Sequence, residues 1–138
     1  MIDIPTLVSE LSRIEHGFTH VVDAGETILA DSKIDSFEIA QQLLSDETYQ
    51  GRMLGIHLLG RLAAKNQEAL DILKNKVSKD PDWRNQEMLA KAFDQYCADL
   101  GYEKALPIIK EWLADENPNV VRAVTEGLRI WTSRPFFK

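Results

Sequence analysis

A two-helix unit that recurs about every 35 residues constrains the fold of this chain more than any other feature. Three polar segments mark the recurrence, and their acidic first residues lie 34 and 36 positions apart: Asp46-Glu47-Thr48-Tyr49, Asp80-Pro81-Asp82-Trp83 and Glu116-Asn117-Pro118-Asn119. Six positions after each acid come Arg52, Gln86 and Arg122, and two positions later Leu54, Met88 and Val124. Helix pairs repeated at about this interval are typical of an α-solenoid. A plain helical bundle with chance similarity is the alternative.

Apolar residues follow a helical period along nearly the whole chain, and no stretch alternates with period two. We therefore expect no strands. N-terminal helices are predicted over about 5–30, and six further helices over about 36–45, 48–64, 67–78, 83–99, 103–114 and 118–132. Short connections make neighbouring helices antiparallel. The predicted fold is all-α, a right-handed α-α superhelix formed by one domain of residues 1–138, with helix pairs at about 36–64, 67–99 and 103–132.

Several residues predict where these helices begin and end. Pro5 suits a first helical turn, and Asp35 with Glu38 resembles a capping box. Gly101 is suited to end a helix, and Pro107 either kinks its helix or marks its true start.

The C-terminal end does not resemble the polar repeat that normally closes a solenoid. Phe136 and Phe137 are adjacent apolar residues in the last segment. Either they pack under the last helix pair, or the natural chain continues past Lys138; we favour continuation or an incomplete C-terminal cap.

Charge is divided unevenly along the chain, whose net charge is −6. Residues 1–69 hold 5 Lys/Arg and 11 Asp/Glu, whereas residues 70–138 hold 11 of each. An acidic protein is a poor general nucleic-acid binder, because affinity for phosphates needs lysine and arginine. After Asn117 the sign reverses, however, so a local basic face is available, formed by Arg122, Arg129, Arg134 and Lys138 against Glu126.

Composition predicts a cytoplasmic protein without a membrane partner. No apolar run is long enough to span a bilayer, and the first residues lack the features of a secretory signal. The single cysteine, Cys97, cannot form an internal disulfide and is expected to be a small buried hydrophobe.

Three stretches carry a resemblance to a known family: 36–38 with 49–54, 82–90, and the more specific 117–129, which reads Asn-Pro-Asn-Val-Val-Arg-Ala-Val-Thr-Glu-Gly-Leu-Arg. Together they resemble the HEAT-like DNA alkylation repair family, best known for bacterial alkylpurine DNA glycosylases. The resemblance covers most of the chain, although family members are usually longer. It implies a curved array of HEAT-like helix pairs that holds duplex DNA in a concave basic groove.

The resemblance also implies an activity. The glycosylases of this family excise cationic N3- or N7-alkylated purines with a carboxylate and aromatic residues, and they use no metal or organic cofactor. Other members bind DNA with little or no glycosylase activity. The family therefore implies duplex DNA, with or without alkylated bases, as the partner more strongly than it implies catalysis.

Glu87 and Trp83 are the predicted catalytic residues. They lie four positions apart at the start of a helix and share a face. The resemblance places the family's catalytic acid on this helix a few residues after a tryptophan; here Glu stands where the glycosylase has Asp. A carboxylate stabilises an oxocarbenium ion, and an indole holds a cation. The alternative is a solvated glutamate that favours a helix N-terminus.

Four arginines are predicted to contact DNA phosphates: Arg52, Arg84, Arg122 and Arg129. Arg122 corresponds to the family's phosphate-facing arginine. Its alternative is a ladder between repeats, with Arg52 and an acid such as Asp46. Arg129 and Arg134 are otherwise ordinary solvated residues, and Glu126 is expected to pair with Arg122, four positions before it.

The remaining notable side chains are expected to be structural. Trp112 and Trp131 fall at apolar helical positions and are predicted core residues, as is His57. His16 and His20 lack the partners of a metal site, and we find no phosphate loop or nucleophile elbow.

A non-enzymatic HEAT scaffold that binds another protein is the competing function. The acidic first half and the large concave surface of a solenoid support it. A basic groove formed by the four arginines favours DNA, whereas an apolar or acidic groove favours a protein partner.

Overall fold

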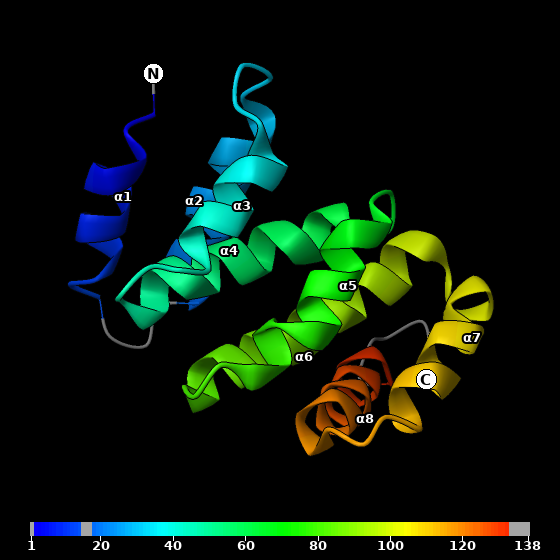
Figure 1. Cartoon of the computed structure of the whole chain (residues 1–138). Coiled ribbons are helices and arrows are strands. Elements are labelled where there is room, and N and C mark those ends of the chain that lie inside the picture. The colour runs from blue at the N-terminus through cyan, green and yellow to red at the C-terminus, as the bar shows by residue number, and fades with distance from the viewer. Residues whose placement is uncertain (1, 15–17, 133–138) are drawn as a thin grey trace.

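The computed structural model describes residues 2–14 and 18–132, the last three of them by their backbone alone. Within these residues every regular element is a helix (Figure 1). The elements are α1 (Ile4–Leu11), α2 (Phe18–Ala30), α3 (Ser36–Leu43), α4 (Tyr49–Leu62), α5 (Gln67–Asn75), the 3₁₀ helix η1 (Val77–Lys79), α6 (Trp83–Leu100), α7 (Tyr102–Leu113) and α8 (Pro118–Thr132). The all-α prediction is confirmed. The predicted helix over 67–78 is α5 followed by η1.

Three antiparallel pairs, α3/α4, α5/α6 and α7/α8, stack so that α4, α6 and α8 form one row (Figure 1). Helices of this row approach closely because small residues face each other. A Cβ built on Gly60 would lie 2.7 Å from the Cβ of Ala92, and one on Gly127 would lie 3.1 Å from the carbonyl oxygen of Ala90. This packing confirms the solenoid prediction and rejects the plain bundle.

The row of α4, α6 and α8 forms the concave side. Phe18, at the start of α2, contacts this row, because its ring centroid lies 5.1 Å from the ammonium of Lys91 on α6. On the other side, Lys74 of α5 pairs with Glu111 of α7 at 3.3 Å and with Asp115 at 3.7 Å. The backbones of α4, α6 and α8 approach one another more closely than those of α3, α5 and α7 do, so the array curves toward the first row, and α3, α5 and α7 lie on the outer side.

The core between the rows is continuous and contains large side chains. Trp112 of α7 is fully buried, and its ring centroid lies 4.4 Å from that of Phe93 on α6. Cys97 is also buried, and burial, with a smaller effect of Asp94, raises the pKa of its thiol to about 12. The predictions for Trp112 and Cys97 are confirmed.

The second helix of each pair begins with the same N-terminal capping arrangement, which two polar residues form. An aspartate accepts a hydrogen bond from the backbone N–H two residues later, and that second residue caps the helix with its own side chain. The aspartates are Asp46, Asp80 and Asp115, and the corresponding caps are Thr48, Asp82 and Asn117. These side chains satisfy backbone donors that a helix start otherwise leaves unpaired.

The cap positions correct the repeat register expected for the third unit. The acid equivalent to Asp46 and Asp80 is Asp115, not Glu116. Counting from the caps, Val121 therefore takes the place of Arg52 and Gln86, and the expected equivalence of Arg122 with Arg52 is wrong by one residue. One residue is a rotation of about 100° around a helix. Arg122 thus shares its face with Glu87 and Met53.

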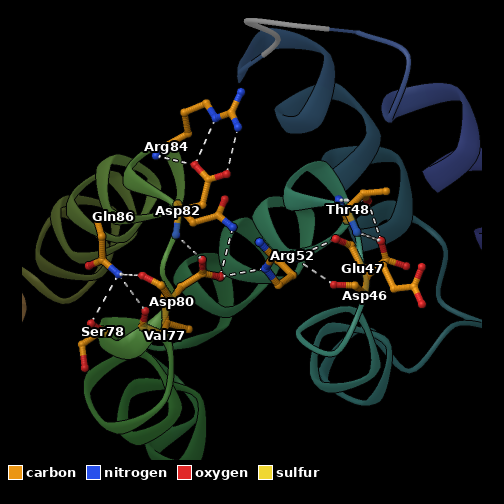
Figure 2. Close-up of polar contacts among 12 residues, drawn as sticks. Asp46, Glu47, Thr48, Arg52, Val77, Ser78, Asp80, Asp82, Arg84 and Gln86 are labelled. Carbon is orange, nitrogen blue, oxygen red and sulfur yellow. Dashed lines mark hydrogen bonds and ion pairs between the residues drawn. The ribbon is translucent and has the colours of Figure 1, made fainter.

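A ladder of side-chain hydrogen bonds joins the units along the edge where these helices begin (Figure 2). Arg52 donates from Nε to Oδ2 of Asp80 at 2.9 Å and from Nη1 to the carbonyl oxygens of Asp46 and Glu47. Gln86 donates from Nε2 to three carbonyl oxygens, those of Val77, Ser78 and Asp80.

The ladder continues to the third unit through asparagines. Asn119 donates to the carbonyl oxygen of Ser78 at 2.8 Å, and Asn117 donates to the Ser78 hydroxyl at 3.0 Å. The start of α8 is therefore tied to η1 and, through Ser78, to Gln86 at the start of α6. These contacts fix the position of α8 relative to α6.

The predicted helix ends are mostly found. The Asp35 carboxylate accepts from the backbone N–H of Glu38 at 3.1 Å. Gly101 has φ 98°, a conformation that suits glycine, and it ends α6 and precedes α7. Pro107 lies inside α7, so it does not mark the start of that helix.

Some predictions concern atoms outside the described set: His16, the side chain of Trp131, and the terminal residues Arg134, Phe136 and Phe137. No helix in the described segments is both long enough and apolar enough to cross a bilayer.

Candidate binding cleft between two helices

A cleft of about 560 Å³ opens between α6 and α8 on the concave side. This volume falls in the range of small-molecule and base-sized binding sites. Its walls are formed by Gln86, Glu87, Ala90 and Lys91 of α6 and by Asn119, Arg122, Ala123, Glu126 and Arg129 of α8.

Helical periodicity explains which side chains face the cleft. Glu87 and Lys91 lie four residues apart on α6, and Arg122, Glu126 and Arg129 follow at spacings of four and three on α8, so each set shares one helix face. The corrected register puts Glu87 and Arg122 at equivalent positions, each five residues after its cap. The helices therefore present an acid and a base to the same cleft.

The charges of Glu87 and Arg122 are not neutralised locally. Neither the Glu87 carboxylate nor the Arg122 guanidinium makes a hydrogen bond or ion pair with any residue in the described ranges. Arg129, by contrast, donates from Nη1 to both carboxylate oxygens of Glu126 at 3.1 Å. The expected Glu126–Arg122 salt bridge is thus wrong, and one charge of each sign stays available to a ligand.

The end of the cleft nearest the helix starts is held rigidly. Gln86 and Asn119 line it, and both are anchored to the Ser78 carbonyl through the ladder. The side-chain oxygen of Gln86 is buried and lacks a hydrogen-bond partner among the described residues. These contacts fix the spacing of the two walls before any ligand enters.

Trp83 and Arg84 lie at the start of α6 but outside the walls of the cleft. Trp83 is 59% exposed, one turn before Glu87. Arg84 bonds both carboxylate oxygens of Asp82 at 3.0 and 2.9 Å, and its guanidinium carbon lies 3.4 Å from the Tyr49 ring centroid. The hydrogen bonds from Arg84 lower the pKa of the Asp82 carboxyl, although partial burial opposes this shift.

Arg52 does not line the cleft, and its side chain has a structural role instead. Its side chain is 19% exposed and its guanidinium is engaged in the ladder. The ladder considered for Arg122 therefore exists, but Arg52 forms it. A DNA contact by Arg52 remains a prediction without a free guanidinium to support it.

The sequence predictions omitted Lys91, Gln86 and Asn119 from the cleft. Lys91 was detectable, because it lies one helical turn after Glu87. Gln86 and Asn119 were not, because their position depends on contacts with η1.

His57 lies away from this cleft and is partly buried against α2. Its Nε2 is 3.1 Å from a carboxylate oxygen of Glu26, which Arg61 also contacts at 3.1 Å. Burial lowers the pKa of the His57 imidazole despite the neighbouring carboxylate. Within the described segments, no group of three His, Cys, Asp or Glu side chains is arranged to hold a metal ion.

Comparisons with known proteins agree with this architecture. Residues 38–129 match a family model for HEAT repeats. The crystal structure of AlkD2 from Streptococcus mutans is 44% identical with a TM-score of 0.89, covering 97% of this chain and 65% of that one. The structure of smu.31 from Streptococcus mutans UA159 is 39% identical with a TM-score of 0.83, covering 98% and 67%. This chain thus spans about two thirds of either relative, and no curated protein matches significantly.

Proposed function

Because this chain belongs to the HEAT-repeat family, as a member of the AlkD type, we propose that it binds duplex DNA across α6 and α8 and acts on N3- or N7-alkylated purines. One observation carries the proposal: Glu87 and Arg122 face the same cleft without a partner among the described residues. A carboxylate suits a cationic base, and a guanidinium suits a phosphate.

The proposed chemistry uses the charge already present on an alkylated purine. Its glycosidic C–N bond breaks with the electron pair leaving on the base, and positive charge develops on the sugar. The Glu87 carboxylate stabilises that charge, and water then adds to the sugar carbon and loses a proton. Trp83, exposed one turn earlier, offers an indole face to the cationic base or sugar.

The four arginines have three different roles in this proposal. Arg122 and Arg129 line the cleft and contact phosphates, although Arg129 must first leave Glu126. Arg84 lies beside Trp83 at the start of α6, outside the walls of the cleft, and contacts the DNA backbone from there. Arg52 supports the interface through the ladder, and its direct contact with DNA is the least supported of the four.

DNA binding is expected to depend on Arg122. Replacing it with alanine should weaken binding to a fluorescent duplex about tenfold at low salt, because a charge-assisted hydrogen bond to phosphate is lost. Anisotropy over a salt series should also give a slope smaller by about one. Arg13→Ala is the matched control, because Arg13 is exposed and lies in the turn after α1, outside the cleft. If the parent protein binds no duplex at low salt, the proposal is wrong.

Base release is expected to depend on the Glu87 carboxylate. Glu87→Gln should slow the release of methylated purines from alkylated duplex by about a hundredfold, because stabilisation of the developing cation is lost. Chromatography of the supernatant measures the released base. Glu68→Gln on α5 changes the same charge at an exposed position away from the cleft and should leave the rate unchanged. Equal release by Glu87→Gln and the parent protein would exclude this role of Glu87.

A protein-binding scaffold is the second candidate, and the mixed charge of the cleft supports it. Glu87 and Glu126 contribute acids to the same walls as the basic residues, and the whole chain carries a net charge of −6. Such a surface fits a peptide with both charge signs. Absence of duplex binding in the anisotropy series would favour this candidate over DNA.

A further inference from the structure

A second cavity, of about 520 Å³, lies where α4 and α6 end and α7 begins. These helix ends meet on the side of the molecule away from the starts of α4 and α6 (Figure 1). Its walls are Leu29, Arg61, Leu62, Ala64, Lys65, Asp99, Leu100 and Lys104. It shares no lining residue with the α6–α8 cleft.

The cavity concentrates positive charge in an acidic protein. Three of its lining residues are basic, and Asp99 is the sole acid among them. Asp99 is already engaged, because it accepts from Gln95 at 2.8 Å and lies 3.9 Å from Arg61. The side-chain ammonium groups of Lys65 and Lys104 make no hydrogen bond or ion pair within the part of the chain that the structure describes.

The position of the Lys104 charge does not stabilise the fold. It lies in the first turn of α7, where the helix dipole favours an acidic side chain over a basic one. Lys65 follows α4 and lines the same cavity, which therefore holds two lysines whose side chains have no ion-pair partner among the described residues. An anion in this cavity would compensate both charges.

The rest of the wall is apolar. Leu29, Leu62 and Leu100 come from three different helices and form a surface that water solvates poorly. Binding sites for small molecules typically combine such a surface with a few charged groups that fix orientation.

We propose that this cavity binds a small organic anion, a phosphate or carboxylate carried on a compact apolar body. Lys65 and Lys104 hold the anionic group, and the three leucines cover the body. Arg61 stays with Glu26 and keeps the end of α4 in place beside α2. The site is separate from the proposed DNA cleft and does not depend on that function.

Titration of the ¹⁵N-labelled protein with phenyl phosphate tests this proposal. Chemical-shift changes should saturate at the amides of Lys65, Leu100 and Lys104 and leave Glu87 and Arg122 unchanged. Inorganic phosphate should bind more weakly because it lacks the apolar body, and benzyl alcohol should bind more weakly because it lacks the charge. Benzoate in place of phenyl phosphate separates a carboxylate preference from a phosphate preference.

Charge-removing variants complete the test. Lys65→Gln and Lys104→Gln, both at exposed positions, should each raise the Kd for phenyl phosphate about tenfold. Lys110→Gln, an exposed lysine on the same helix as Lys104, should leave the Kd unchanged. The proposal is overturned if the two variants bind as tightly as the parent, if benzyl alcohol binds as well as phenyl phosphate, or if the shifts map to the α6–α8 cleft.

Discussion

Replacing Trp112 with alanine should lower the free energy of unfolding by about 4 kcal/mol, because truncation of a buried tryptophan leaves a large cavity. Trp112 is fully buried and packs on Phe93 with ring centroids 4.4 Å apart. It joins α7 of the outer side to α6 of the concave row. Urea unfolding followed by circular dichroism measures the change.

A matched substitution separates the loss of packing from a general effect on α7. Leu113→Ala removes the neighbouring side chain, which is 43% exposed, and should cost less than about 1 kcal/mol because little buried surface is lost. If the Trp112 and Leu113 variants are equally stable, the core described between the two rows is incorrect.

Replacing Asp80 with alanine should lower the free energy of unfolding by about 3 kcal/mol, because several donors lose a common, partly buried acceptor. The Asp80 carboxylate accepts from Arg52 Nε at 2.9 Å, from Asn85 Nδ2 at 3.1 Å and from the backbone N–H of Asp82 at 2.9 Å. Its side chain is only 9% exposed, so water replaces these contacts poorly. Thermal and urea unfolding both report the loss.

Two controls identify the ladder as the cause. Asp23→Ala removes an exposed aspartate on α2 and should change stability by less than about 0.5 kcal/mol. Asp80→Asn keeps an acceptor of similar shape and should recover part of the loss. A stability of Asp80→Ala within error of the parent would show that the ladder does not hold the units together.

Most of the fold was predictable because its signals are local. Helical period and polar connections predict the helices and their pairing, and Asp35 and Gly101 lie at helix boundaries as expected. The register of the third unit was missed because Asp115 and Glu116 are adjacent acids. Only the hydrogen bond from the Asn117 backbone N–H to Asp115 distinguishes them.

The candidate site was predictable only in part. Glu87, Arg122 and Arg129 could be named in advance, since chemistry and helical spacing mark them, and all three line the cleft. The role of Arg52 could not be separated from that of Arg122, because the pattern contains no information on which arginine meets Asp80. Such pairings depend on how one unit docks on the next.

The glycines of the concave row set the spacing between its helices, and substitutions there can change that spacing during evolution. The backbones of α4 and α6 touch at Gly60, and those of α6 and α8 touch at Gly127, where even a methyl group would press on Ala92 or Ala90. A larger residue at either place acts as a spacer that widens the aperture between neighbouring helices. Ligand size can therefore be retuned from positions that never meet the ligand, while the charged groups stay as they are.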